Sequence, residues 1–450
     1  MRKSLTVTSS LVTASAAVIV AALAGPAAVP RRLTATPRLA GATARPATAR
    51  LVAVAGPAGV RPATARSAPL ASRPVHAGTG CPSSGGPSSG GAGVGGALGW
   101  RLRRALNRLV LMPSGPPAVI VIVRRPGFRA VYRAGTASQA DPVPPTASDH
   151  VRLASVSKAF SGAVALSLVA QGKLALGERI GQVLPHLPAA WRAVTLADLL
   201  QHRSGLPDYS ASPALLRRVL RAPHRPIAPM ALLHYVWNLP LRFRPGTRYR
   251  YDNSDNVLAA MMARAVTHRS YRFLLRTLVF GPAGLRQSSL PSGFAMPRPY
   301  LHGYLLAAGQ PAADVSEALT ASIAWASGGI VATPDDLSRF IRGYLDGRFF
   351  PRRIQAAQFR FVPGQSEPPG PGINSAGLAI FRYQTRCGTV YGHTGNFLGY
   401  TQFAAASRSG ADSVTVTATE QLSPRAHPAV FAALREAESL AVCAALRPAR

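Results

Sequence analysis

The stretch Ala154-Ser155-Val156-Ser157-Lys158 opens an apolar segment that runs to about Leu174 and is typical of a buried helix. At a helix start, Ser155 and Lys158 lie one turn apart on the same face. The positive end of the helix then lies beside the serine oxygen, and burial lowers the pKa of a lysine. The pair can therefore form an activated nucleophile, although a capped core helix explains the same residues without catalysis. The chain has only Lys3, Lys158 and Lys173 as lysines, which makes this pairing informative.

A second candidate feature is Tyr251-Asp252-Asn253, which follows Arg244-Pro245-Gly246-Thr247 and precedes an apolar helix from Val257 to Val266. A tyrosine and an asparagine two residues apart on a turn can face one cleft, where the phenol accepts a proton and the amide contacts substrate. A turn with a half-buried tyrosine is the alternative interpretation.

The third feature is Tyr391-Gly392-His393-Thr394-Gly395-Asn396, expected between a strand that ends near Val390 and one that resumes at Leu398. Its glycines allow a ligand to approach the backbone, and His393 and Thr394 offer side-chain donors. By itself, His-Thr-Gly is also typical of an ordinary hairpin edge.

In this order, Ser155-x-x-Lys158, Tyr251-x-Asn253 and His393-Thr394-Gly395 resemble the three motifs of serine penicillin-recognising enzymes. The most similar branch holds the class C β-lactamases, the D-alanyl-D-alanine carboxypeptidases and their esterase relatives. Intervening segments also resemble family signatures, and the resemblance covers roughly residues 98–445. These segments are Leu199-Leu200-Gln201-His202-Arg203-Ser204-Gly205-Leu206-Pro207, Ser327-Gly328-Gly329-Ile330 and Thr333-Pro334-Asp335-Asp336-Leu337.

A competing middle motif, Ser254-Asp255-Asn256, spells the form found in class A β-lactamases. Class A enzymes also need a downstream glutamate for deacylation, whereas no acidic residue follows Asp255 until Asp314. The class A interpretation therefore fails. Gln201, Arg203 and Asp252 depart from the usual family residues but replace no reacting group.

The resemblance implies a mechanism in which Ser155 attacks a carbonyl carbon while Lys158 and Tyr251 accept and relay its proton. Lys158, held close as a cation, would favour the phenolate form of Tyr251. Asn253 would bind the substrate amide, and His393, Thr394 and Gly395 would line the substrate site. The backbone N–H groups of Ser155 and Asn396 would form the oxyanion hole, each such donor contributing about 3 kcal/mol. No metal or cofactor is implied.

The resemblance also implies an α/β (α+β) fold of the β-lactamase/transpeptidase type. A helix-flanked antiparallel sheet would join residues 98–150 to about 375–445, with a mostly helical insertion between them. The residue pattern agrees, with strands expected at 118–123, 128–133, 400–406 and 414–419 and a last helix near 427–446. Leu98, Leu102, Leu106 and Leu109 share one face of an Arg-rich helix, which either packs onto the domain or lies on a membrane surface.

The N-terminus has the parts of a secretory signal peptide over residues 1–28. Arg2 and Lys3 precede an uncharged stretch that ends in Ala22-Leu23-Ala24, and a membrane anchor is the alternative. Residues 29–97 are rich in Ala, Pro, Arg, Gly and Ser without apolar periodicity, so a disordered linker is expected. We therefore expect a secreted, extracellular protein, either free or associated with the cell wall or membrane.

The formal charge of +34 comes from 51 Lys+Arg against 17 Asp+Glu. The basic tail either holds the protein near anionic wall polymers or is merely a solvated linker. A nucleic-acid partner is not expected, because the tail has few aromatic residues and export removes the partner. The expected partner is a small peptide, β-lactam or ester substrate of a monomeric enzyme.

The leading hypothesis is a D-alanyl-D-alanine carboxypeptidase, with an esterase or β-lactamase of the same family as rivals. A non-catalytic wall-binding or penicillin-binding module is the alternative from another class. Cys387 and Cys443 either form a disulfide or remain buried thiols, and Cys81 has no evident role.

Overall fold

The structure, a computed structural model, describes residues 96–306 and 311–446. The expected signal peptide, residues 29–95 of the expected linker and Cys81 lie outside these ranges. Within them, no helix is both long and apolar enough to span a membrane.

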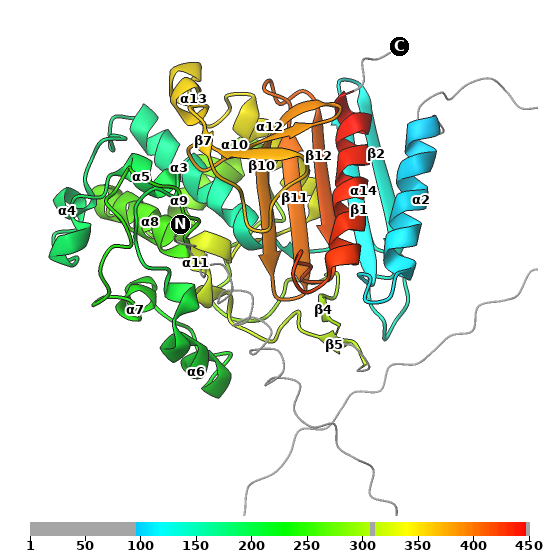
Figure 1. Ribbon diagram of the computed structural model, residues 1–450, viewed down its shortest axis with the longest axis horizontal. Coiled ribbons are helices and arrows are strands. Elements are labelled where there is room, and N and C mark those ends of the chain that lie inside the picture. The colour runs from blue at the N-terminus through cyan, green and yellow to red at the C-terminus, as the bar shows by residue number, and fades with distance from the viewer. Residues whose placement is uncertain (1–95, 307–310, 447–450) are drawn as a thin grey trace, which may run out of the picture. The chain divides into compact units, whose positions relative to one another are not determined.

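An eight-stranded antiparallel sheet forms the centre of the domain, in the order β2-β1-β12-β11-β10-β9-β8-β7 (Figure 1). Strands from the two ends of the domain meet in it, since β1 pairs with β12. The strands are β1 (Ala118–Arg125), β2 (Phe128–Gly135), β7 (Val362–Pro363), β8 (Ile373–Ala376), β9 (Phe381–Thr385), β10 (Gly388–Phe397), β11 (Tyr400–Ala406) and β12 (Ser413–Ala418).

Two tight turns set the register of this sheet. Pro126 and Gly127, the latter with φ 68°, connect β1 to β2, since proline fits the first corner of such a turn and glycine the second. Leu398 and Gly399 connect β10 to β11 with φ values of 24° and 80°. Positive φ at both corners matches the twist of the flanking strands.

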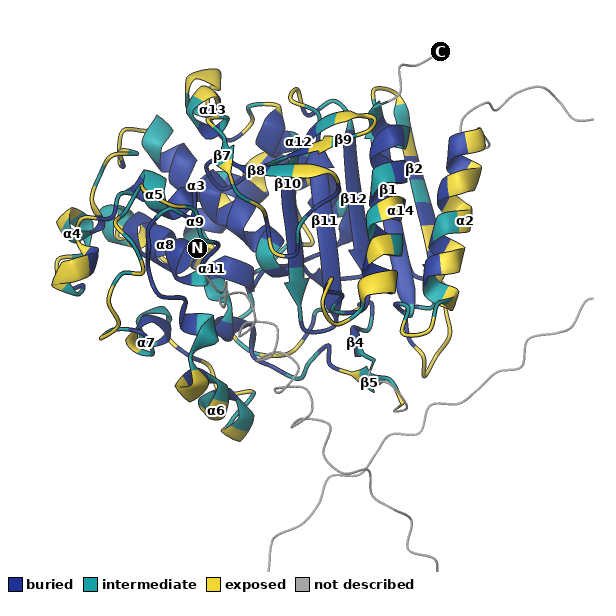
Figure 2. Cartoon of the chain, in the orientation of Figure 1, coloured by how far each residue is buried: buried dark blue, intermediate teal, exposed yellow. Residues whose placement is uncertain are grey.

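Helices α2 (Ala97–Leu111) and α14 (Pro428–Leu446) pack side by side over one face of the sheet (Figure 1). The apolar stripe of α2, Leu98, Leu102, Leu106 and Leu109, is buried in the core beneath these helices, while the arginines of α2 are exposed. Figure 2 shows the buried and exposed sides of the helix. Packing onto the domain, rather than onto a membrane surface, therefore explains the apolar stripe of α2.

The mostly helical part lies between β2 and β7 in the chain and builds the larger core. Helix α12 (Pro334–Leu345) contacts β1, β11 and β12, so it covers the other face of the sheet. The remaining helices are α3 (Ser157–Ala170), α4 (Ile180–Val183), α5 (Leu196–Leu200), α6 (Pro213–Arg221), α7 (Pro229–His234), α8 (Asn253–Thr267), α9 (Tyr271–Leu275), α10 (Gly281–Ala283), α11 (Trp325–Gly328) and α13 (Arg352–Gln358). Short strands pair as β3 (Val151–Arg152) with β6 (Val331–Ala332) and β4 (Tyr304–Leu305) with β5 (Ala313–Asp314).

Two sequence expectations need correction. The segment 391–396 does not separate two strands but lies inside β10, because its glycines allow neighbouring backbone to approach closely and do not break the ladder. The C-terminal part of the sheet also begins earlier than expected, at Val362, because two short strands precede β9.

The open question about the cysteines is settled by a disulfide between Cys387 and Cys443. It joins the turn between β9 and β10 to helix α14, so it fastens the last helix to the sheet.

Candidate active site

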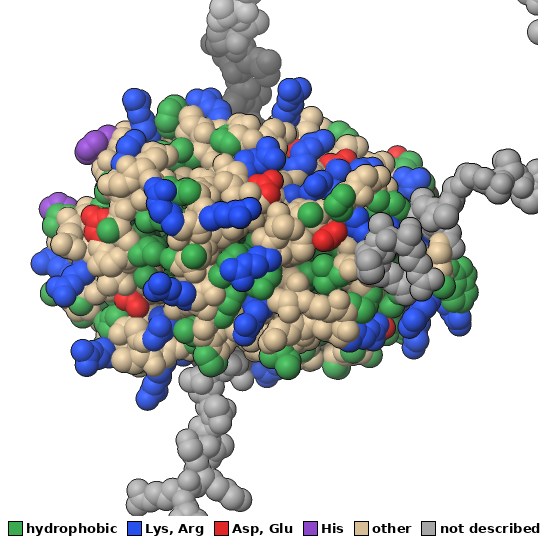
Figure 3. All heavy atoms as spheres, turned by 90° about the horizontal axis from the view of Figure 1, so that it is seen from above, with side chains coloured by type: hydrophobic (Ala, Val, Ile, Leu, Met, Phe, Trp, Pro, Cys, Tyr) green, Lys and Arg blue, Asp and Glu red, His purple; other side chains and the backbone are tan. Residues whose placement is uncertain are grey.

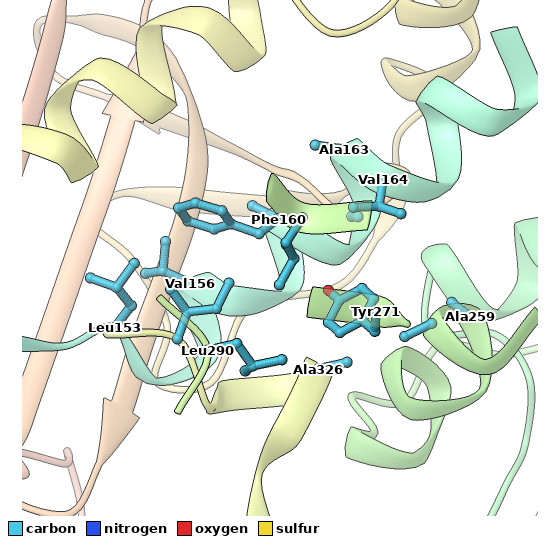
Figure 4. Close-up of a cluster of buried hydrophobic side chains, with 14 of the residues drawn as sticks. Leu153, Val156, Phe160, Ala163, Val164, Ala259, Tyr271, Leu290 and Ala326 are labelled. Carbon is cyan, nitrogen blue, oxygen red and sulfur yellow. The ribbon is translucent and has the colours of Figure 1, made fainter. Parts of the chain in front are cut away.

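Ser155 lies on a short 3-10 turn, Ala154–Val156, directly before α3. The preceding Ala154 has φ 49°, a left-handed conformation that costs a non-glycine residue about 1 kcal/mol or more. Leu153 and Val156 on either side are fully buried, and Figure 4 shows them in the apolar cluster with Phe160. This packing fixes the turn, so the serine is held rather than free to move.

Lys158 is fully buried one turn after Ser155. Its Nζ lies 3.1 Å from Ser155 Oγ, 2.7 Å from Asn253 Oδ1 and 2.9 Å from the Ser327 carbonyl oxygen. Burial lowers the pKa of Lys158 to about 7, because desolvation disfavours the ammonium more than nearby carboxylates such as Asp208 stabilise it.

The three contacts of Lys158 also fit its neutral form. A neutral amine has two N–H donors and one lone pair, and both a side-chain amide oxygen and a carbonyl oxygen accept hydrogen bonds. When the N–H groups donate to Asn253 and Ser327, the lone pair is left for the Ser155 hydroxyl. The geometry therefore suits a lysine that takes the proton of Ser155.

Tyr251 packs against the same lysine. Lys158 Nζ lies 4.8 Å from the centre of the Tyr251 ring. The centres of the His202 and Tyr251 rings are 4.6 Å apart, and the two ring planes are tilted relative to each other. The phenol oxygen is buried beside Ser155 but makes no hydrogen bond of good geometry to any described residue. Burial raises the pKa of Tyr251 well above its ordinary value of 10. The expectation of a phenolate favoured by a lysine cation is therefore wrong, since burial leaves the phenol neutral.

Asn253 is the first residue of α8 and lies in the site, but its polar atoms are already used. Its Oδ1 accepts from Lys158, and its Nδ2 donates to Asp208 Oδ2 at 3.1 Å and to Ser210 Oγ at 2.9 Å. The expected role as a substrate donor thus gives way to one in orienting the lysine. Asp208 and Ser210 were missed by sequence reasoning, although they directly follow the Leu199–Pro207 signature.

The competing motif Ser254-Asp255-Asn256 has a structural role. Ser254 donates to the Pro207 carbonyl at 2.8 Å, and Asn256 donates to Ser161 at 2.7 Å. Asp255 lies 2.9 Å from His202 Nδ1, and burial raises the pKa of Asp255 while lowering that of His202. Asp255 Oδ2 and His202 Nδ1 therefore share a hydrogen bond that is closed to solvent. This pair fixes the His202 ring that stacks on Tyr251.

On β10, His393 and Thr394 are fully buried and turn their donors inward. His393 Nδ1 donates to the Thr394 carbonyl at 2.5 Å, and Thr394 Oγ1 donates to the Pro368 carbonyl at 2.6 Å. Burial lowers the pKa of His393 to about 3, so the imidazole is neutral and its Nε2 is an acceptor with no described partner. The structure therefore brings His393 to Tyr251, at 6.3 Å between ring centres, but Thr394 has no hydrogen left for substrate.

Gly395 and Asn396 contribute through their backbone. A Cβ atom on Gly395 would lie 2.6 Å from the Leu153 carbonyl oxygen and 3.1 Å from Ser155 N, so only glycine lets β10 approach the nucleophile this closely. The Asn396 side chain donates to the Leu422 carbonyl at 2.9 Å. Because a two-residue turn connects β10 to β11, Phe397 and Tyr400 form a hydrogen-bonded pair. Backbone N–H groups along an antiparallel strand point alternately toward and away from the partner strand, so the N–H of Asn396, one residue before Phe397, points away from β11. Because β9 pairs with β10 only to Gly392, that N–H faces the open edge beside Ser155.

The described residues contain no cluster of three or more His, Cys, Asp or Glu side chains that could hold a metal ion. What converges instead is a serine, a buried amine of lowered pKa, a neutral phenol and two backbone N–H groups. This set can transfer an acyl group through the serine.

Residues 111–438 match the protein family described as Beta-lactamase. The chain belongs to the beta-lactamase family. The fold and family expected from the motifs are thereby confirmed, and the chain is a serine hydrolase of the beta-lactamase fold.

Individual relatives have diverse activities. D-alanyl-D-alanine-carboxypeptidase/endopeptidase AmpH of Escherichia coli is 27% identical over 272 residues, 57% of this chain and 67% of that protein. Protein Rv1367c of Mycobacterium tuberculosis is 31% identical over 222 residues, 44% of this chain. The matched part spans 55% of that relative's length. The solved structure of a D-stereospecific amidohydrolase from Streptomyces sp. has a TM-score of 0.63 at 27% identity, covering 71% of this chain and 94% of that one.

Proposed function

We propose that this protein is an exported serine peptidase that cleaves peptides containing D-amino acids, with D-alanyl-D-alanine peptides of the cell wall as the first candidates. The proposal depends mainly on one observation: the buried amine of Lys158 lies 3.1 Å from Ser155 Oγ, and burial lowers the pKa of this amine to about 7. Support for the substrate class comes from the names of the similar carboxypeptidase/endopeptidase and D-stereospecific amidohydrolase.

In the proposed mechanism, neutral Lys158 takes the Ser155 proton as the serine oxygen bonds to the substrate carbonyl carbon. The carbonyl π-electron pair moves to the oxygen, which the N–H groups of Ser155 and Asn396 stabilise. The tetrahedral intermediate collapses, and the leaving amine takes a proton from the Tyr251 phenol, which the Lys158 ammonium replenishes. Water then attacks the acyl-enzyme by the same steps, releasing the acid and restoring Ser155.

Export is part of the proposal. The charged start and apolar middle of residues 1–28 support it, and so does the Cys387–Cys443 disulfide, because such bonds persist in oxidising compartments. Arg and Lys side chains spread over the domain face in Figure 3 with few acids between them, which suits surroundings rich in anionic wall polymers.

The proposal is tested by incubating the purified chain with a penicillin and locating the adduct by peptide mass spectrometry. We expect one added penicillin on Ser155 and none in Ser155→Ala. Turnover of a D-alanyl-D-alanine peptide, a chromogenic cephalosporin and an acyl ester, measured side by side, then separates peptidase from β-lactamase and esterase. Binding of wall material without any acyl-enzyme would contradict the proposal and favour a non-catalytic binding module.

A further inference from the structure

Helix α2 has a second face, opposite to the leucines that pack on the sheet (Figure 2). Because successive residues of a helix are about 100° apart, Trp100, Arg104 and Leu111 lie within about 40° of one another and point away from the buried leucines. Trp100 is 58% exposed and Leu111 is 82% exposed. Six large hydrophobic residues are exposed in the described part of the chain, and only these two share one helix or strand. A single exposed leucine needs no explanation, but two apolar side chains aligned on one face indicate a contact surface.

Arginines surround these two side chains on the outer face of α2. The four arginines of the helix are all exposed, and none forms an ion pair with a described residue. Aromatic rings hold two of them instead. The guanidinium carbon of Arg104 lies 5.4 Å from the centre of the Trp100 ring, and that of Arg103 lies 5.2 Å from the Tyr132 ring. The outer face therefore combines cationic groups with exposed apolar groups.

The elements packed against α2 do not neutralise its charge. The helix contacts β1, β2 and α14, and the first acidic residue of the chain, Asp141, follows both strands. Helix α14 carries two acids, Glu436 and Glu438. The Glu436 carboxylate lies 2.7 Å from Arg386, and the buried Glu438 carboxylate lies 2.7 Å from Arg435. Both are already paired, so the face formed by α2 is complementary to an anionic partner.

Helix α2 also lies far from the reacting serine. It packs on β2, which is the edge strand of the sheet, whereas β10 is the fifth strand in the order β2-β1-β12-β11-β10 (Figure 1). Four strand spacings amount to roughly 19 Å. A partner bound along the outer face of α2 therefore leaves the site around Ser155 open to substrate.

We propose that the outer face of α2 lies on a membrane surface that contains anionic lipids and holds the domain there. The arginines bind the phosphates of the lipid head groups, while Trp100 and Leu111 enter the boundary between head groups and acyl chains. Tryptophan suits this boundary, because its ring is apolar and its N–H can still meet a polar acceptor. A soluble polyanion such as a wall polymer would use the arginines but offers no apolar phase for Leu111. The combination of charge and apolar groups therefore favours lipid.

The contribution of charge is tested by floating the full chain with vesicles of phosphatidylglycerol or of phosphatidylcholine. We expect the wild type to bind the anionic vesicles at least about tenfold more tightly than the neutral ones. Combined Arg101→Gln, Arg104→Gln and Arg108→Gln should weaken binding to phosphatidylglycerol by at least about tenfold. The control removes the same charge from three exposed arginines on and after α6, Arg217→Gln, Arg221→Gln and Arg225→Gln, and should bind as the wild type does.

The contribution of the apolar groups is tested on the same vesicles. Combined Trp100→Ser and Leu111→Ser should also weaken binding at least about tenfold, whereas Leu239→Ser with Ile373→Ser, at two exposed apolar residues elsewhere, should not. Phosphatidylglycerol with brominated acyl chains should quench tryptophan fluorescence, and Trp100→Phe should abolish this quenching. Residues 1–95 contain no tryptophan, so the quenching reports α2 and not the preceding chain.

Unchanged vesicle binding in the arginine variant or in Trp100→Ser with Leu111→Ser would overturn the inference, and so would quenching that persists in Trp100→Phe. Soluble polyphosphate is the probe for the other partner. Polyphosphate binding that needs the arginines but not Trp100 and Leu111, together with no binding to vesicles, would make this face a site for anionic polymers. Ser155→Ala should bind vesicles as the wild type does, so the outcome does not depend on the proposed function.

Discussion

The start of α3 and the open end of β10 face each other across the site, and they contribute in opposite ways. At the start of α3, the side chains of Ser155 and Lys158 carry the chemistry, and packing holds their backbone in place. On β10, the side chains of Thr394 and Asn396 bond inward, and the backbone is presented to the site. Two sequence motifs therefore contribute in different ways, one through its side chains and the other through its backbone.

This difference shows that a motif residue need not act through its side chain. Gly395 is required because it has none, and Asn396 matters for an N–H that any residue except proline would provide. Substitutions on α3 and on β10 should consequently have effects of different size, and they should affect different properties, namely catalysis or the position and stability of the backbone.

The largest effect is expected for Lys158→Ala, which removes the amine 3.1 Å from Ser155 Oγ. Loss of a general base typically costs 10²–10⁴-fold, so we expect penicillin acylation of Ser155 to slow by about 10³-fold. Lys173→Ala, at an exposed lysine, is the matched control and should acylate at the wild-type rate. A normal acylation rate in Lys158→Ala would show that the lysine takes no part in catalysis.

A smaller but still large effect is expected for Gly395→Ala. The new methyl group would lie 2.6 Å from the Leu153 carbonyl oxygen, so β10 and the serine turn must move apart. A misplacement of this order costs about 10²-fold in rate, measured as acylation by single turnover. Gly177→Ala, where the methyl group meets nothing within 4 Å, controls for the substitution itself, and thermal unfolding confirms that both variants fold.

The smallest effect on activity is expected for Thr394→Val, which removes only the hydrogen bond to the Pro368 carbonyl. Leaving that carbonyl unpaired should lower the free energy of unfolding by about 1–3 kcal/mol, measured by chemical denaturation. Turnover of an uncharged substrate should change less than threefold. A hundredfold loss would mean that the Thr394 hydroxyl binds substrate directly, and the contrast between α3 and β10 would fail. Thr389→Val on the same strand serves as the control.

The fold was predicted from the family resemblance that the spaced motifs carry, and apolar periodicity agreed with it, because both are local signals. The stripe of leucines on α2, the strands at 400–406 and 414–419 and the Ser155–Lys158 spacing all depend on residues close in the chain. The family resemblance implied only that the two ends of the domain share one sheet. The pairing of β1 with β12 comes from the structure, since no local pattern specifies it.

Sequence reasoning was less successful where burial decides the chemistry. The neutral state of Tyr251 and the hydrogen bond from Asn253 to Asp208 depend on contacts between segments that are distant in the chain. The spacing of residues within a motif does not show such contacts. The segment 391–396 was expected between two strands, although it lies within one, where its glycines allow neighbouring backbone to approach closely.

The central claim, that a neutral Lys158 takes the proton of Ser155, is tested most directly by the pH dependence of acylation. Burial lowers the pKa of Lys158 to about 7, and only the deprotonated amine can accept the serine proton. The single-turnover rate with a fluorescent penicillin should therefore rise with pH through about 7 and level off above pH 8, with the same midpoint in Tyr251→Phe. A midpoint near 10, or one that disappears in Tyr251→Phe, would contradict the account and make the phenol the base.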